Sequence, residues 1–227
     1  MPEPRPGQFF MVEVNKGTDP LLKRAFSLFR KTAQGVQILY RVRGKGTTVL
    51  KEMKEGSLVE VLGPLGTCYP PPSEGSVPLV IAGGIGIASV FSFVEQVSGR
   101  AIVFYGARTK DDLLMLNELQ GSAKEVLVST DDGSAGQKGT IADSLSAYLS
   151  GPQSPIPNYR IYACGPHLLL KAISDIARAH KIPAYLSMEE HMACGIGACL
   201  GCVVKTRNGY TRVCKEGPVF EAREIVW

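Results

Sequence analysis

Four cysteines near the C-terminal end of the chain have a spacing that can hold an iron–sulfur cluster. Cys194, Cys199, Cys202 and Cys214 follow the pattern C-x4-C-x2-C-x11-C. Thiolates are soft anionic ligands that suit iron, and C-x4-C-x2-C is the plant-type [2Fe–2S] spacing. The alternative is a structural zinc site, but zinc ribbons usually carry two C-x2-C knuckles, and only Cys199 and Cys202 form one. The spacing therefore predicts a [2Fe–2S] cluster.

Glycines separate these cysteines, at positions 195, 197 and 201. They keep side chains away from the cluster, so backbone N–H groups can approach the sulfurs and tune the cluster potential.

Two glycine-bearing turns predict a dinucleotide site. The apolar run 79–82 leads into Gly83, Gly84 and Gly86, and a second run, 159–163, leads into Cys164, Gly165 and Pro166. A strand–turn–helix of this kind presents free N–H groups to a pyrophosphate. The first turn lacks the full GxGxxG spacing and alone could be only a tight turn. Both turns follow predicted parallel strands, however, and ligands bind at the carboxyl ends of such strands.

Charged residues after two of the predicted strands bear on which dinucleotide is preferred. Asp131 and Asp132 follow the third strand of this region, where acidic groups favour ribose hydroxyls and hence NADH. Arg108, after the second strand, favours the 2′-phosphate of NADPH instead. We expect NADH.

The overall composition narrows the class of protein. The 227 residues are 44% hydrophobic and 20% charged, with a net charge of +4 and no polybasic block, so neither nucleic acid nor a membrane is the expected partner. The first eight residues contain no apolar h-region, so we expect no secretory signal and a cytoplasmic location. In that reducing compartment six cysteines favour metal or redox chemistry over disulfides.

The pattern of residues divides the chain into three domains, an all-β domain, an α/β domain and a small cluster domain. Residues 1–75 predict a small antiparallel barrel that ends in a proline-rich linker, with strands at 9–14, 25–29, 36–42 and 58–62 and a helix at 47–54. Residues 76–186 predict a doubly wound parallel sheet, with strands at 79–82, 101–105, 125–129, 159–163 and 184–188 and helices at 87–97, 111–119, 141–149 and 168–180. Residues 187–227 form the predicted [2Fe–2S] domain.

The ordered motifs resemble a known family. The segments that resemble the flavin barrel of the ferredoxin-NADP reductase superfamily are Arg24-Ala25-Phe26-Ser27, Leu39-Tyr40-Arg41, Gly46-Thr47 and residues 63–66. The two glycine turns resemble its nicotinamide domain. The segment from residue 187 through the four cysteines is similar to the electron-transfer subunit of NAD-dependent (class 1B) dihydroorotate dehydrogenase.

This resemblance implies FAD on the barrel. Arg24 to Ser27 would lie along the flavin and its phosphates, with Ser27 near the isoalloxazine ring. Leu39 to Arg41 and Gly46-Thr47 would hold the ribityl chain and pyrophosphate, and Cys164 would lie near the nicotinamide. The family carries proline where Ala25 stands, and an additional N-terminal strand. We therefore expect an edge near residues 9–14 to be open or covered by a partner.

The implied function is electron transfer. A hydride carries two electrons and the cluster accepts one at a time, so a flavin between them is needed. The expected route is NAD(H), FAD, [2Fe–2S] and then the FMN of a partner dihydroorotate dehydrogenase catalytic subunit, in a heterotetramer of two plus two, for pyrimidine (UMP) biosynthesis. The chain leaves no room for the eight-stranded barrel that such chemistry normally uses, and we identify no catalytic acid or base.

Two alternatives use the same motifs. One is an NAD(P)H–ferredoxin oxidoreductase-type subunit of another redox complex. The other is a non-enzymatic redox sensor that uses the [2Fe–2S] cluster as a switch and needs no nicotinamide site.

Overall fold

The computed structural model describes residues 3–151 and 158–227. Met1 and Pro2, which begin the polar N-terminal segment, lie outside the described residues. In the ranges that are described, no helix combines the length and the apolar character needed to cross a membrane.

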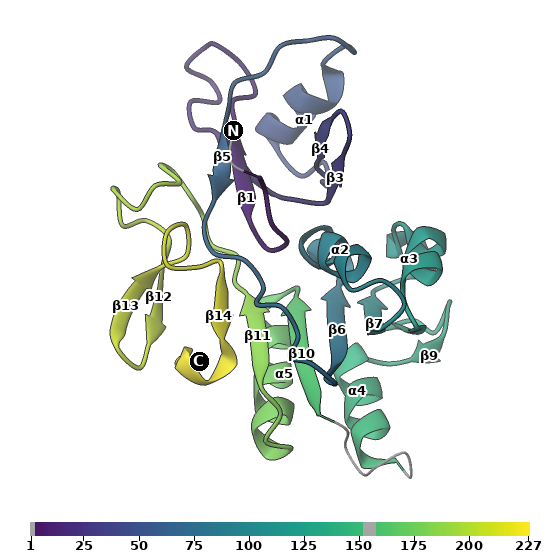
Figure 1. The fold of residues 1–227 in the computed structure, drawn as a ribbon. Coiled ribbons are helices and arrows are strands. Elements are labelled where there is room, and N and C mark those ends of the chain that lie inside the picture. Colours follow the sequence, from purple (N-terminus) through teal and green to yellow (C-terminus); the bar gives the residue numbers. More distant parts are fainter. Residues whose placement is uncertain (1–2, 152–157) are drawn as a thin grey trace.

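The N-terminal part is built from short antiparallel strands. A three-stranded sheet has the order β2-β1-β5 and contains β1 (Phe9–Val12), β2 (Arg24–Ser27) and β5 (Val61–Leu65). A separate hairpin joins β3 (Arg30–Thr32) to β4 (Gly35–Gln37), and α1 (Lys45–Glu52) lies beside it (Figure 1). The apolar side chains of β1 and β2 that point inward pack on Leu28 and fix this arrangement.

The expectation of an open edge near residues 9–14 is wrong. Strand β1 is central, pairs with β2 on one side and β5 on the other, and is buried throughout. The edges of this sheet are β2 and β5, and the residues just before β5 are open to solvent, with Leu58 97% exposed. The apolar run predicted as a strand at 58–62 forms regular strand only from Val61, although the Glu60 carbonyl already accepts from the Glu13 N–H at 2.9 Å.

The central sheet is a seven-stranded mixed sheet with the order β14-β11-β10-β6-β7-β8-β9. Its bounds are β6 (Val77–Gly83), β7 (Ile102–Ala107), β8 (Glu125–Thr130), β9 (Gln137–Lys138), β10 (Tyr159–Cys164), β11 (Ala184–Ser187) and β14 (Val219–Glu221). All pairs are parallel except β11 with β14. The predicted parallel, doubly wound arrangement is confirmed, and β14 is an addition that the sequence did not reveal.

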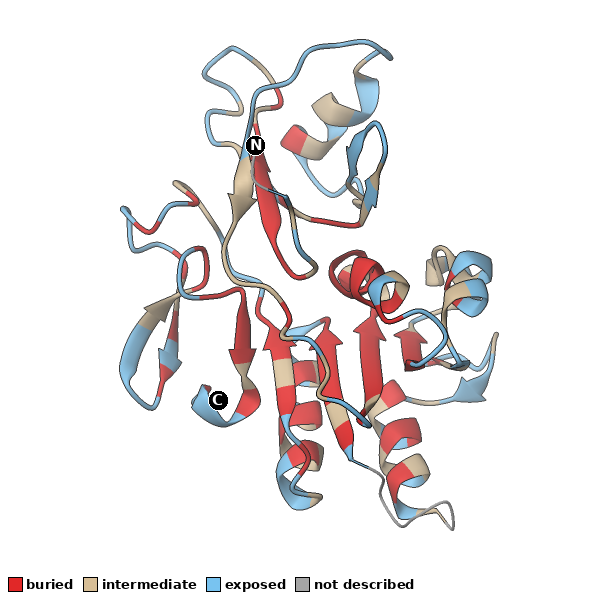
Figure 2. Ribbon diagram, in the orientation of Figure 1, coloured by how far each residue is buried: buried red, intermediate tan, exposed pale blue. Residues whose placement is uncertain are grey.

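Helices cover both faces of this sheet because alternate strand residues point to opposite sides. Leu79 and Ile81 pack with α4 (Ile141–Ser150) and α5 (His167–Ala179), whereas Val80 and Ala82 pack with α2 (Ile87–Gln96) and α3 (Leu116–Ser122). The strands between the helices are almost entirely buried (Figure 2). The predicted helix at 111–119 is divided into the 3-10 turn η2 (Lys110–Asp112) and α3.

The C-terminal part contains little regular structure. Strands β12 (Val203–Thr206) and β13 (Gly209–Arg212) form a hairpin, and a 3-10 turn, η3 (Ala222–Glu224), follows β14. The cysteine-bearing loop runs from β11 to β12. Because β14 joins the central sheet, this part is anchored to the parallel strands (Figure 1).

The antiparallel part meets the other two parts at specific contacts. The Thr67 hydroxyl donates to the Val219 carbonyl (3.1 Å) and accepts from the Val219 N–H (3.2 Å). On the other side Phe29 packs on Phe91 of α2, with ring centroids 4.6 Å apart, and Arg30 Nε lies 2.7 Å from a Glu95 oxygen.

We predict that Thr67→Val lowers the free energy of unfolding by about 1–3 kcal/mol, because two partly buried backbone groups of Val219 lose their partner. Urea unfolding followed by circular dichroism measures the change. Thr67→Ser keeps the hydroxyl and serves as the control. Equal midpoints for the valine and serine variants would contradict the role of this contact.

Candidate functional site

The two glycine turns meet at the carboxyl edge of the central sheet. A Cβ atom on Gly86 would lie 2.4 Å from the Cys164 carbonyl oxygen, and one on Gly83 would lie 2.9 Å from the Pro166 ring. A Cβ atom on Gly165 would likewise lie 3.0 Å from the Gly83 Cα atom. Only glycine permits this close approach, and within η1 (Gly84–Gly86) the Gly84 position has no neighbour within 4 Å of a Cβ atom and stays open to a ligand. The structure therefore brings the predicted dinucleotide residues together.

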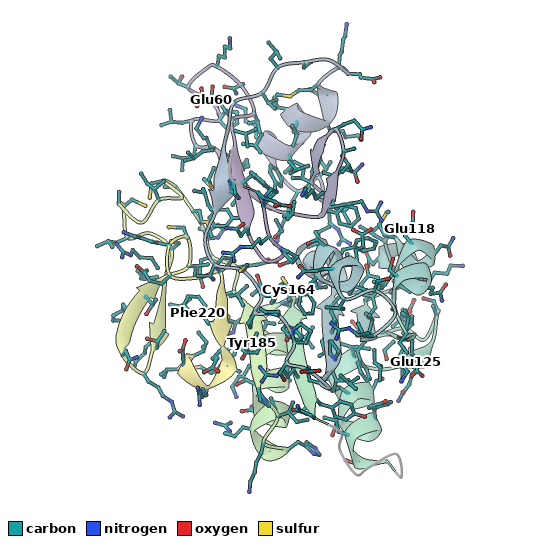
Figure 3. All side chains as sticks on the ribbon, viewed as in Figure 1. Glu60, Glu118, Glu125, Cys164, Tyr185 and Phe220 are labelled. Atoms are coloured by element: carbon teal, nitrogen blue, oxygen red, sulfur yellow. The ribbon has the colours of Figure 1, made fainter. Side chains whose placement is uncertain are left out.

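The Cys164 thiol lies at this carboxyl edge of the sheet, on the side that faces the antiparallel part (Figure 3). It is buried and lies 3.6 Å from a carboxyl oxygen of Glu189. Burial, and then the Glu189 carboxylate, raise the pKa of the Cys164 thiol well above its usual value. Cys164 is therefore a neutral thiol at physiological pH and a donor to Glu189.

The hydroxyl groups of Tyr69, Ser89 and Ser187 belong to the same polar cluster as Cys164 and Glu189. The Tyr69 hydroxyl lies 3.3 Å from Ser89 Oγ, which in turn donates to Ser187 Oγ at 3.2 Å. Burial raises the pKa of Tyr69 well above its ordinary value. Glu189 is exposed, but nearby protein atoms exclude water from its carboxyl group, and this desolvation raises the pKa of Glu189. Sequence reasoning did not single out Tyr69, Ser89 or Ser187, because isolated hydroxyl residues carry no motif.

Arg24 comes together with the start of α1. A Cβ atom on Gly46 would lie 2.4 Å from Arg24 Nε, so the guanidinium fills the space that a side chain would occupy. The Thr47 hydroxyl accepts from the N–H groups of Gly44 (3.1 Å) and Arg43 (2.9 Å) and caps the helix. A cation beside a helix N-terminus suits a phosphate group, so these residues fit the pyrophosphate of a dinucleotide.

The other residues predicted to bind the flavin differ in what they contact and in how far they are exposed. The Tyr40 ring lies 5.5 Å from that of Phe26, and Leu39 packs against the cluster of apolar residues around α2. Arg41 pairs with Asp112 of η2, Nη2 to Oδ1 at 2.6 Å, and so links the antiparallel part to the central sheet. Ala25 is exposed and Ser27 is half-buried on β2.

The four cysteines form two pairs: Cys194, Cys199 and Cys202 lie in the loop between β11 and β12, and Cys214 follows β13. The Cys199 N–H points to Cys194 Sγ (3.4 Å), and the Cys214 N–H points to Cys202 Sγ (3.4 Å). A third donor, the Gly197 N–H, lies 3.1 Å from Cys214 Sγ. Cys202 and Cys214 are buried, whereas Cys194 is half-buried and Cys199 exposed. Each iron of a [2Fe–2S] centre takes two thiolates, so this pairing fits such a cluster.

Backbone donors favour the thiolate form of Cys194, which with Cys199 forms the outer pair. The N–H groups of Cys199 and then Ile196 lower the pKa of Cys194 to about 6. Burial, followed by the nearby Cys202 sulfur, raises the pKa of Cys214 to about 12. Within residues 3–151 and 158–227, no three His, Cys, Asp or Glu side chains converge on a point suited to a single ion.

The cysteine loop packs directly on the antiparallel part. A Cβ atom on Gly195 would lie 2.5 Å from Met11 Cγ and 3.3 Å from a Leu65 methyl group. Beside this contact a hollow of about 500 Å³ separates residues 21–25 from residues 190–192. The predicted flavin motif on β2 and the segment entering the cysteine loop therefore share one surface depression.

Asp131 and Asp132 follow β8 at the same carboxyl edge of the sheet and are exposed. The hydroxyl of Ser134, and then its N–H, donate to Asp132 at 2.7 and 2.9 Å and lower the pKa of this carboxyl. Asp132 is therefore ionised at neutral pH. Arg108, after β7, is also exposed.

Comparisons with known proteins agree with this geometry. A family model described as the iron–sulfur cluster binding domain of dihydroorotate dehydrogenase B matches residues 189–226, which include all four paired cysteines. An oxidoreductase NAD-binding domain model matches residues 80–175. A protein of Desulforamulus reducens named the electron transfer subunit of dihydroorotate dehydrogenase B (NAD(+)) is 37% identical over 231 residues, covering 98% of this chain and 87% of that protein. This chain belongs to that family.

Other relatives extend the same similarity. A homologue of this subunit from Aquifex aeolicus is 36% identical over 228 residues and covers 97% of the chain and 86% of its own length. Among solved structures, one of an NADH-dependent reduced ferredoxin–NADP oxidoreductase, studied for flavin-based electron bifurcation, has a TM-score of 0.84 and 28% identity, over 99% of this chain and 80% of that one. A ferredoxin reductase of carbazole 1,9a-dioxygenase shares the fold, with a TM-score of 0.67 at 24% identity, over 81% and 60% of the two chains.

We predict that iodoacetamide labels Cys194 of the metal-free folded chain about tenfold faster than Cys164 at pH 7, because only the Cys194 thiolate is populated there. The Cys194 rate should fall as the pH is lowered through about 6. Mass spectrometry of tryptic peptides gives both rates, and the chain unfolded in urea provides the control. Equal rates in the folded chain would refute the assigned environments.

Proposed function

We propose that this chain is the electron-transfer subunit of an NAD-dependent dihydroorotate dehydrogenase and connects NAD(H) with a catalytic partner in pyrimidine biosynthesis. The observation that carries the proposal is the contact of Gly195 with Met11 and Leu65, since it places the cysteine loop against the strands with the predicted flavin motif. Family membership and the NAD-binding domain supply the two ends of the route.

The three groups have separate binding residues. We assign the pyrophosphate of NAD(H) to the turn Gly83–Gly86 and to Gly165-Pro166, with the neutral Cys164 thiol at the reacting end. We assign FAD to the motif Arg24–Ser27, to Leu39–Arg41 and to Gly46-Thr47, and the cluster to Cys194, Cys199, Cys202 and Cys214. When bound, FAD can take up a hydride and pass on its two electrons singly, which neither nicotinamide nor a cluster does alone.

The residues of the chain provide position and exclude water. The buried hydroxyls of Ser89 and Ser187 contact the Cys164 thiol, which in turn donates to Glu189, and Tyr69 contacts Ser89. The protonated Cys164 thiol adds no charge beside the nicotinamide. Cys202 and Cys214 are buried, whereas Cys194 is half-buried and Cys199 exposed, so a bound cluster would be held closest to a partner by the outer pair, Cys194 and Cys199.

The surface around the outer pair suits a protein partner. Ile196 and Leu200 are 55% and 60% exposed on the cysteine loop, and Leu21 and Leu22 are exposed at the neighbouring hollow. Exposed apolar groups of this kind mark interaction surfaces. We assign this surface to the FMN-containing catalytic subunit, in a cytoplasmic heterotetramer of two plus two.

Asp131 and Asp132 would select NADH through repulsion of a 2′-phosphate. We predict that Asp131→Asn combined with Asp132→Asn lowers the ratio of kcat/KM for NADH to that for NADPH about tenfold in flavin reduction. Glu125→Gln, at the opposite end of β8, is the matched control and should leave the ratio unchanged. An unaltered ratio in the double variant would place the specificity elsewhere.

Purification of the chain with its catalytic partner tests the function directly. The complex should reduce orotate with NADH, and failure of a fully loaded complex to do so would rule out the dihydroorotate assignment. The structural likeness to the ferredoxin–NADP oxidoreductase favours a second candidate, a subunit of another NAD(P)H–ferredoxin complex. That candidate predicts ferredoxin reduction in place of orotate turnover.

In this complex, Cys199→Ser should leave the bleaching of FAD by NADH intact and lower orotate reduction by at least about 100-fold, because the exit pair of thiolates is incomplete. Stopped-flow absorbance and steady-state turnover measure the two steps. Cys68→Ser replaces a cysteine outside the loop and should change neither. Turnover that survives the loss of the cluster would refute the proposed route.

A further inference from the structure

Arg212, the last residue of β13, contacts the backbone of the cysteine loop. Its Nη1 atom donates to the Gly197 carbonyl at 3.0 Å. The N–H of the same Gly197 donates to Cys214 Sγ at 3.1 Å. One residue of the loop is therefore held between a guanidinium on one side and a sulfur on the other.

Gly197 is suited to this position in two ways. Its φ of +82° lies in the left-handed region that favours glycine. A Cβ atom there would lie 3.3 Å from Arg212 Nη1 and 2.8 Å from Lys215 Cδ, so a larger residue would displace both cations. The absence of a side chain lets the guanidinium reach the carbonyl.

Glu216 fixes the orientation of the guanidinium. Its Oε2 atom accepts from Arg212 Nε and from the Arg212 backbone N–H, each at 3.0 Å, and its Oε1 atom accepts from Nη2. Such a two-pronged pair restricts the planar guanidinium far more than a single contact does. The Arg212 side chain is 29% exposed and that of Glu216 is 38% exposed, so solvent screens their charges only in part.

Reduction of a [2Fe–2S] centre adds one negative charge to a site that is already anionic. A nearby cation and a firmly held N–H donor both stabilise the added charge, and hydrogen bonds to the sulfurs are a known determinant of cluster potential. Arg212 provides both effects, since its charge lies behind the loop and its contact with the Gly197 carbonyl orients the N–H toward Cys214. Lys215 adds a second cation, but its stem packs on Gly197 and donates no hydrogen bond to it among the described contacts.

We propose that Arg212 is a positioning residue that raises the reduction potential of the cluster, and that Glu216 both orients Arg212 and moderates its charge. The inference rests on the cluster ligands proposed above. It concerns the reduction potential of the cluster and does not depend on which acceptor receives the electron.

Redox titration of the cluster in the purified holoprotein, monitored by electron paramagnetic resonance, tests this role. Arg212→Gln should lower the ratio of reduced to oxidised cluster at a fixed potential about tenfold, which for a one-electron couple corresponds to about 59 mV. Arg212→Lys keeps the charge without the fork of donors and should shift the ratio less. Glu216→Gln removes the moderating charge while keeping an acceptor, and should shift the ratio in the opposite direction.

The matched control is Arg223→Gln, which breaks another arginine–glutamate pair of the C-terminal part, Arg223 with Glu221, and changes the net charge by the same amount. Iron and sulfide content confirms loading in every variant. Equal potentials for Arg212→Gln and Arg223→Gln would overturn the proposal, as would shifts of the same sign for Arg212→Gln and Glu216→Gln. If the Arg212→Gln variant does not incorporate the cluster, the redox titrations of Arg212→Lys and Glu216→Gln test the proposal instead. Wild-type protein without iron and sulfide would instead refute the ligand assignment.

Discussion

The arrangement depends on close packing at glycine residues, both within the central sheet and where the parts of the chain meet. Gly86 lies against the Cys164 carbonyl inside the α/β part, whereas Gly195 lies against the Met11 side chain and Gly66 against the Gly217 carbonyl at the boundaries between parts. None of these positions leaves room for a Cβ atom. Electron transfer demands short separations between its centres, and glycine is the residue that allows main chains to approach this closely. The hydroxyl of Thr67 and the Phe29–Phe91 contact then hold the parts in that relation.

The surroundings of the cysteines differ between the two ends of the proposed route. At the nicotinamide end Cys164 and Tyr69 are buried, and burial keeps Cys164 neutral. At the cluster end the backbone supplies N–H donors, which favour thiolates at Cys194. The first environment suits the transfer of a hydride, which needs water excluded, and the second suits an anionic metal centre. The segment that joins Glu189 to Cys194 lines the hollow opposite residues 21–25.

Much of this could be predicted from the sequence, because cysteine spacing and apolar strands followed by glycine turns are local signals. The parallel strands and their helices were placed within a few residues. The contacts of Tyr69, Ser89, Asp112 and Arg212 could not be predicted, since each pairs with a residue distant in sequence or carries no motif. The same holds for β14: its three residues have no strand-like length, and pairing with β11 alone defines them. The edge expected near residues 9–14 rested on the additional N-terminal strand of the family, and it was wrong because β1 pairs on both sides with strands that come later in the chain, β2 and β5.

The pairing of β14 with β11 has a consequence for how the protein is assembled. The register from Tyr185↔Glu221 to Ser187↔Val219 closes a loop that contains all four cysteines. Closing that loop in the unfolded chain costs entropy, and the cost must be met before the sulfurs can converge. Sheet completion and cluster insertion are thus thermodynamically linked, so each stabilises the other. A cell short of iron would accumulate a species whose nucleotide-binding sheet has a less firmly held edge, and such an edge is open to proteolysis and to pairing with other chains.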